Sequence, residues 1–203
     1  MKRLLLLAPV LIIVGCFLFG GKDYLPLAVD NQWVYNVLAT ISASDTVATG
    51  VYTNKIATKI TIGGDDAYKM TVKDSVHLVS PDSAFVTTST VYIRDAKDAF
   101  LTYSDTTEAP DTFLFKDLEL DKTWTQIDTV SHDTTVNTVV LKEDVTVPAG
   151  TYDDCWKVKM VHNSGLPNYY WFASGTGVVK QSFQSINTDT VDILIKLQSA
   201  TIK

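Results

Sequence analysis

The feature that most constrains the fold is a repeated alternation of apolar and polar residues, broken by turn sequences, that runs from Gln32 to the C-terminus. Val, Ile, Thr and Tyr dominate these segments and favour extended strands. Val158 and Met160 fall on one face of such a segment, whereas Lys157 falls on the other. One apolar face and one polar face is typical of antiparallel sheet. We therefore expect an all-β antiparallel meander with very little helix.

Turn sequences such as Gly63-Gly64-Asp65-Asp66 and Pro148-Ala149-Gly150 separate the expected strands. Helical periodicity is nearly absent, and only residues 112–120 fit a turn or two of helix. The expected strands cover residues 32–41, 51–62, 67–79, 85–94, 99–103, 123–130, 135–147, 155–162, 168–173, 178–187 and 191–202.

Similar segments occur in the same order in the two halves of the chain. Residues 27–33 and 118–124 share the pattern aliphatic-x-aliphatic-Asp-x-x-Trp. Two later pairs follow in order: residues 60–70 resemble 145–158, and 91–101 resemble 169–179. The pattern predicts half-repeats at about 24–111 and 112–203.

Each predicted half forms a meander with one apolar face that it does not bury alone. We therefore expect the halves to close over a shared core as a barrel, a sandwich or a strongly curled sheet. Trp33 and Trp124, which stand at equivalent positions, are predicted to be core residues rather than ligand platforms.

The N-terminus carries the parts of a secretory signal: basic Lys2 and Arg3, an apolar run over residues 4–14, and a small residue before Cys16. The run is shorter than the about 20 apolar residues that a membrane-spanning helix needs, and Pro9 interrupts it. An ordinary secretory signal and an uncleaved anchor both remain compatible with this pattern.

The sequence Ile13-Val14-Gly15-Cys16 resembles the lipobox of bacterial lipoproteins. The resemblance implies cleavage between Gly15 and Cys16, with a diacylglyceryl group on the Cys16 thiol and a further acyl chain, such as palmitate, on its amine. Two or more acyl chains give durable anchoring. It also implies a signal peptide at 1–15, which leaves a tether at 16–23, and the strand pattern places one β domain at 24–203. Phe17 follows the cysteine instead of Asp, which in this family favours the outer membrane on its periplasmic side.

Three further segments resemble motifs of a group of uncharacterised bacterial envelope lipoproteins: residues 24–35, 145–155 and 169–180. Their patterns are Pro-Leu-x-Val-x-x-x-Trp-x-Tyr, Val-Pro-Ala-Gly-Thr-Tyr and Tyr-Tyr-x-Ala-x-Gly-x-Gly-x-Val-Lys. Asp30 departs from the group, which usually has Gly there. In architecture alone, a lipid-anchored β shell is also similar to LolA/LolB-like and DUF3108-like proteins. The group has no known catalytic residues, so the resemblance implies none here.

The overall charge argues against nucleic acid as a partner. The 203 residues include 17 Lys and Arg against 23 Asp and Glu, which gives a formal net charge of −6. Binding to a phosphate backbone needs a clustered positive surface.

No catalytic, cofactor or metal site is predicted. His77, His132 and His162 do not stand at ligand spacing, and each is interpreted as a surface or turn residue. Cys155 is the one thiol besides Cys16, and its acidic neighbours disfavour the reactive thiolate. The pairs Asp65-Asp66 and Asp153-Asp154 are interpreted as solvated turn residues, because adjacent strand residues point apart.

We therefore expect a non-enzymatic, lipid-anchored cell-envelope domain that binds or scaffolds, with an apolar ligand or an envelope protein as partner. One alternative is an envelope glycan hydrolase, which requires two carboxylates roughly 5–10 Å apart. Another is a surface-displayed adhesion module. The ligand-binding residues, and whether the shared core is filled or hollow, remain open.

Overall fold

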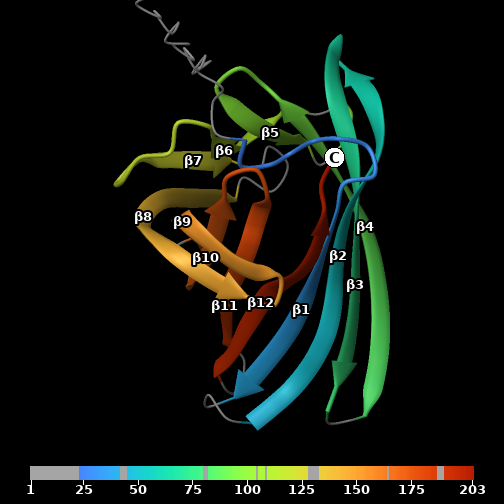
Figure 1. The fold of residues 1–203 in the computed structure, drawn as a ribbon, viewed down its shortest axis with the longest axis vertical. Helices are drawn as coiled ribbons and strands as arrows, with labels where there is room; N and C mark the ends of the chain where they lie inside the picture. The colour runs from blue at the N-terminus through green and yellow to red at the C-terminus, as the bar shows by residue number, and fades with distance from the viewer. Residues whose placement is uncertain are drawn as a thin grey trace, which may run out of the picture.

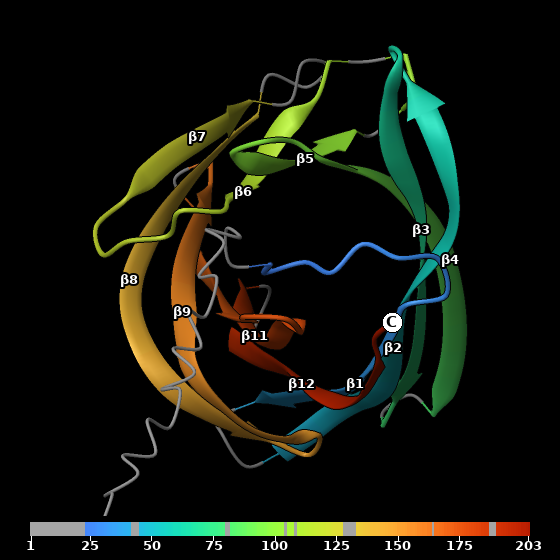
Figure 2. The ribbon, with the colours of Figure 1, turned by 45° about the horizontal axis from the view of Figure 1, so that its top comes forward.

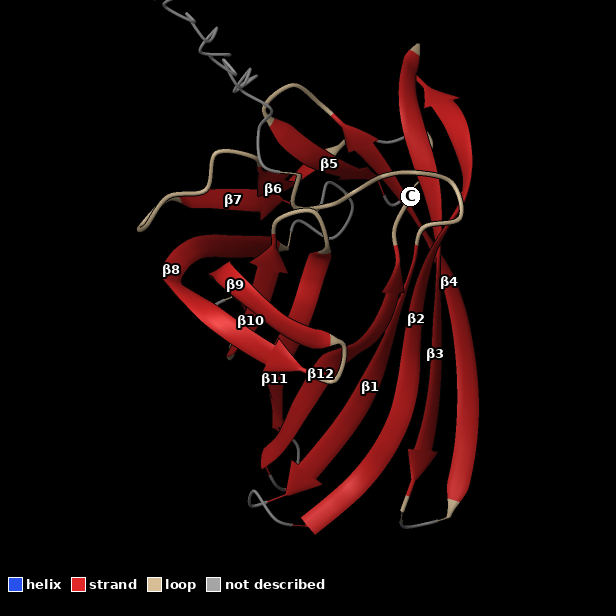
Figure 3. Cartoon of the chain, viewed as in Figure 1, coloured by secondary structure: helices blue, strands red, loops and turns tan. Residues whose placement is uncertain are grey.

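All the strands that the computed structural model describes belong to one antiparallel sheet (Figures 1 and 3). The structure describes residues 23–41, 45–79, 82–103, 105–107, 109–127, 133–163, 165–186 and 190–203. The predicted signal peptide, Gly15, Cys16 and His132 lie outside the described residues, as does the tether before Asp23. No helix among the described residues is long and apolar enough to cross a membrane.

Within the described ranges the sheet has 12 strands and no helix. Their bounds are β1 (Gln32–Ile41), β2 (Asp45–Ile62), β3 (Asp65–Leu78), β4 (Ser83–Asp95), β5 (Ala99–Tyr103), β6 (Asp111–Phe115), β7 (Thr123–Ile127), β8 (Thr134–Val147), β9 (Gly150–His162), β10 (Pro167–Ala173), β11 (Gly177–Ile186) and β12 (Thr190–Thr201).

The strand order makes the sheet a nearly closed barrel. Except for β6 and β7, consecutive strands pair with each other, and β1 also pairs with β12, so the order runs β6-β5-β4-β3-β2-β1-β12-β11-β10-β9-β8-β7. The two ends of the sheet, β6 and β7, are consecutive in the chain, and the ring is open between them (Figure 2). The prediction of an all-β antiparallel meander that curls over a shared core is confirmed.

The expected turn of helix at residues 112–120 is wrong at its start, because Asp111–Phe115 forms β6. This strand pairs with β5, where Leu114 lies opposite Phe100, and both side chains are almost fully buried. Pairing and burial on β5 decide the conformation of a segment whose own pattern is too short to fix it.

The turns that precede Trp33 and Trp124 have the same backbone geometry. Asp30 and Asp121 have positive φ angles of 73° and 65°. The amide of Asp30 donates to the carbonyl of Ile56, and that of Asp121 donates to Val139, both at 2.9 Å. Each turn thus fixes the start of its strand against the following strand in the same way.

Both tryptophans are core residues, with exposures of 2% for Trp33 and 8% for Trp124.

The tip of the β8–β9 hairpin adds to the core by folding back onto β12. There the amide of Ala149 donates to the carbonyl of Leu197 at 3.1 Å, and Val147 packs in the same cluster as Leu197.

The segment before β1 crosses the mouth of the ring instead of running along its outside (Figure 2). Tyr24 and Leu25 are buried within it. The carbonyl of Asp23 accepts a 2.6 Å hydrogen bond from the amide of Gly175, which lies in the β10–β11 turn. The segment therefore forms part of the wall around the barrel interior.

Candidate functional site: a cavity inside the barrel

The interior of the barrel is not completely filled. A cavity of about 220 Å3 lies inside it, lined by side chains from β1 to β6, β10, β11 and the crossing segment. Its apolar lining includes Met70, Val91, Ile93 and Phe113, and its aromatic lining includes Trp33 and Tyr170. This cavity answers the question that the sequence left open, because the shared core is partly hollow.

Strand alternation explains why these residues face the cavity. Tyr52 and Asn54 are two residues apart on β2, and Met70 and Val72 are two apart on β3. Residues two apart in a strand share a face. The register between β2 and β3 places Asn54 opposite Val72. These side chains therefore form one continuous stretch of wall.

Leu25 supplies the part of the wall that does not come from a strand. It follows Tyr24, whose hydroxyl accepts a 2.9 Å hydrogen bond from Nε1 of Trp156 on β9. The crossing segment is thereby held against the opposite side of the barrel, and one edge of the cavity depends on where this segment lies.

Every described residue that lines the cavity is uncharged, and the polar groups among them are amides and hydroxyls. The hydroxyl of Tyr35 donates to the carbonyl of Val178 at 3.0 Å, and burial raises the pKa of Tyr35. Burial also raises the pKa of Tyr170 to about 12. The tyrosines thus stay neutral at physiological pH, and the cavity suits an apolar or amphiphilic molecule.

One polar atom of the lining lacks a partner. Oδ1 of Asn54 has less than 1 Å2 of exposed surface and no hydrogen-bond donor among the described residues. The same is true of Oδ1 of Asp74, which lies two residues after Val72 on β3. Buried polar atoms are usually hydrogen-bonded, so unpaired acceptors beside a cavity mark a place for an incoming donor.

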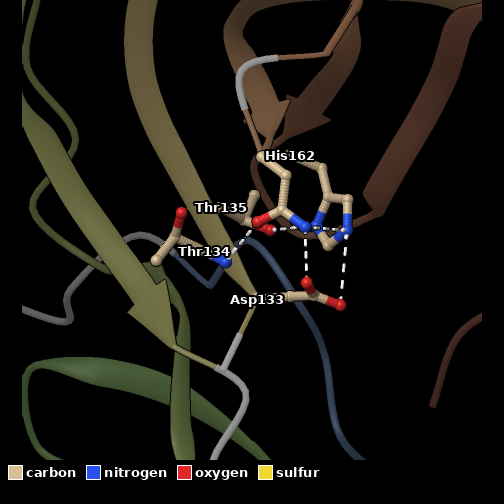
Figure 4. Close-up of polar contacts among 5 residues, drawn as sticks. Asp133, Thr134, Thr135 and His162 are labelled. Carbon is tan, nitrogen blue, oxygen red and sulfur yellow. Dashed lines mark hydrogen bonds and ion pairs between the residues drawn. The ribbon is translucent and has the colours of Figure 1, made fainter. Parts of the chain in front are cut away.

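A separate polar pocket, also of about 220 Å3, lies near the open seam of the barrel. In Figure 4, His162 at the end of β9 lies beside Thr135, with 3.2 Å between Nδ1 and the hydroxyl oxygen. Asp133 contacts the other side of the ring, with 3.8 Å between its Oδ2 and Nε2. Asn163 donates to Oδ1 of Asp133 at 2.5 Å and accepts from the amide of Thr134 at 2.8 Å. The remaining lining residues of this pocket are Asp111 and Gln126.

The predicted turn carboxylates belong to neither cavity. Asp65 forms an ion pair with Arg94 at 2.5 Å, Asp66 with Lys59 at 2.6 Å, and Asp154 with Lys142 at 2.9 Å. Ion pairs of this kind on the surface contribute little to stability.

Cys155 is fully buried, and its thiol donates to the carbonyl of Tyr152 at 3.4 Å. Burial, together with the nearby carboxylates, raises the pKa of this thiol to about 11. The thiolate is therefore disfavoured, as the acidic neighbours in the sequence predicted.

The cavity residues Asn54 and Tyr170 and the neighbouring Asp74 were not predicted. The signal that could have identified them is a polar residue on the inward face of a strand, but only the strand register shows which face is inward.

Comparison with known proteins supports the fold alone. No protein-family model matches the chain, and no curated protein matches it. A solved structure of a "putative exported protein with YmcC-like fold" from Bacteroides fragilis aligns with a TM-score of 0.53 at 11% identity, over 87% of this chain and 97% of that one. The two chains share a fold. A "putative lipoprotein" from Parabacteroides distasonis aligns with a TM-score of 0.47 at 13% identity, over 88% of this chain and 98% of that one.

Proposed function

We propose that the protein is a non-enzymatic, lipid-anchored protein of the cell envelope whose barrel binds an apolar or amphiphilic ligand in its interior. The observation that carries this proposal is the cavity of about 220 Å3 with its uncharged, largely apolar lining. Sites for small molecules are concave and mostly apolar, with a few polar groups that orient the ligand.

The volume limits the size of the ligand. It exceeds the roughly 150 Å3 of an engineered apolar cavity that binds benzene. It is smaller than the roughly 300–1,000 Å3 of sites for drug-sized molecules. A single short alkyl chain or a one- to two-ring compound matches this range.

The lipobox resemblance supports an envelope location. Acyl groups on Cys16 would place the barrel directly at a membrane surface, since only a short tether separates this cysteine from the crossing segment. The outer membrane, on its periplasmic side, is the location that the residues after Cys16 favour. A membrane is also a source of apolar ligands. If Cys16→Ala still incorporates labelled palmitate and still partitions into detergent, the lipid anchor is disproved.

The binding test uses the full chain, extracted in mild detergent and exchanged into amphipol, with 1-naphthylamine as a fluorescent two-ring reporter that matches this size range. Val91→Trp fills the cavity and is expected to reduce reporter binding at least about tenfold. Val86→Trp is the matched control, because this residue of the same strand is 58% exposed. Circular dichroism checks that both variants fold. Equal binding by both variants, or no binding by the unmodified chain, contradicts the proposal.

Native mass spectrometry of the same preparation identifies a ligand that copurifies. A scaffolding role for an envelope protein instead predicts that reporter binding is absent while a partner protein copurifies. A glycan hydrolase receives less support, since the paired carboxylates at the turns are held in surface ion pairs. Surface display predicts that protease treatment of intact cells removes the barrel.

A further inference from the structure

Two unpaired acceptors lie on the same stretch of the barrel wall. They are Oδ1 of Asn54 on β2 and Oδ1 of Asp74 on β3, each with less than 1 Å2 of exposed surface and without a donor among the described residues. A buried acceptor without a donor costs free energy that an incoming donor recovers.

The strand register brings the two acceptors together. Asn54 lies opposite Val72, and Asp74 lies opposite Tyr52, in a part of the β2–β3 pairing that has no register shift. Asn54 and Asp74 are thus diagonal neighbours on one face, and diagonal neighbours in antiparallel sheet stand about 7 Å apart. Tyr52, which lies opposite Asp74 and two residues before Asn54, also lines the cavity.

The other pair of unpaired buried groups among the described residues has a local explanation. Nε1 of Trp124 and Oδ1 of Asn137 are a donor and an acceptor on residues that lie directly opposite each other on β7 and β8. These two groups are therefore complementary to each other. Oδ1 of Asn54 and Oδ1 of Asp74 are both acceptors, so these two atoms cannot satisfy each other, and each needs a donor from another group.

The apolar part of the cavity begins beside these acceptors. Met70 precedes Val72 on the same face of β3 and lies next to Val91 in the β3–β4 register, and Ile93 follows on β4. A ligand whose polar end meets Asn54 and Asp74 therefore has an apolar surface along which its chain can extend.

We propose that the cavity takes a short-chain amphiphile whose head group donates hydrogen bonds, a hydroxyl or an ammonium, with the head at Asn54 and Asp74 and the chain against Met70, Val91 and Ile93. This inference rests on the proposed function, because it names the ligand class of the same cavity. Anionic heads are excluded, since both receiving atoms are acceptors and one belongs to a carboxylate.

The test compares three ligands with the same chain, 1-octanol, octylamine and octanoate, as competitors of the naphthylamine reporter on the full chain in amphipol. Octanol and octylamine are expected to displace the reporter at concentrations at least about tenfold lower than octanoate. The concentrations at which octanol and octylamine displace the reporter show whether the site prefers a hydroxyl or an ammonium head. Equal displacement by all three overturns the head-group inference and leaves the apolar binding function standing. Failure of the reporter to bind the unmodified chain overturns both.

Variants assign the effect to the two acceptors. Asp74→Asn retains the shape of the side chain and is expected to reduce the preference for octylamine over octanoate to within about twofold. Asp98→Asn makes the same charge change at an exposed position and is the matched control, expected to retain the preference. Asn54→Leu is expected to weaken the binding of octanol about tenfold; the affinity of this variant for the reporter is measured separately, and circular dichroism checks its fold. Unchanged preferences in Asp74→Asn contradict the proposal even if Asn54→Leu does not fold.

Discussion

Nε1 of Trp156 donates a 2.9 Å hydrogen bond to the hydroxyl of Tyr24, and this bond joins the middle of β9 to the segment that crosses the barrel mouth. The neighbouring residue, Leu25, lines the cavity. Tyr24 and Leu25 therefore link two features of the molecule. One is the position of the segment that leads toward the predicted lipid anchor, and the other is the shape of the ligand cavity.

Tyr24→Phe tests this link. The variant retains the buried ring but leaves Nε1 of Trp156 without its partner, and we expect a loss of about 1 kcal/mol in the free energy of unfolding. The crossing segment should open more often, so the fluorescent reporter should dissociate severalfold faster in stopped-flow measurements. Tyr92→Phe, a change of the same kind on β4, is the control. Equal dissociation rates for Tyr24→Phe and the unmodified protein would show that the crossing segment does not control access to the cavity.

Gly50 tests the packing of β2 against β3. A Cβ atom at this position would lie 2.5 Å from the backbone carbonyl oxygen of Ser75, which cannot move without disturbing the strand pair. We expect Gly50→Ala to lower the free energy of unfolding by about 1–3 kcal/mol in urea denaturation. The adjacent, exposed Thr49→Ala should change it by less than about 0.5 kcal/mol. A variant as stable as the original would mean that the two strands separate locally at no cost.

The buried thiol of Cys155 should make the free energy of unfolding depend on pH in the alkaline range. Its pKa is raised from 9.0 to about 11, so the folded state retains the thiol proton that the unfolded chain loses first. This contribution is full below about pH 9 and is lost as the pH rises through about 11. In urea titrations at about pH 8 and about pH 10.5, Cys155→Ala should lose less stability with rising pH than the unmodified protein. Parallel losses would assign the alkaline effect to other groups, such as the buried tyrosines.

The strands could be predicted because their alternation is local, and only β6 was missed. Phe113 and Phe115 flank Leu114 in a segment too short to show a period, and its strand conformation comes from pairing with β5. The cavity could not be predicted because it depends on register. In the sequence, Asn54 and Asp74 look like the solvated polar residues on either side of them, and only the alignment of β2 with β3 shows that both face inward.

The two equivalent turns before Trp33 and Trp124 provide a final prediction. Asp121 has a φ of 65°, a conformation that glycine adopts without strain and that costs a residue with a Cβ atom about 1 kcal/mol. Asp121→Gly is therefore expected to leave the free energy of unfolding unchanged or slightly higher, whereas Asp121→Val should lower it by about 1–2 kcal/mol. Asp30, with a φ of 73°, is less suitable for this test because its carboxylate also contacts the Lys203 ammonium at 3.0 Å. Urea denaturation of the two Asp121 variants measures the difference directly, and equal stabilities would show that this turn relaxes out of the left-handed conformation.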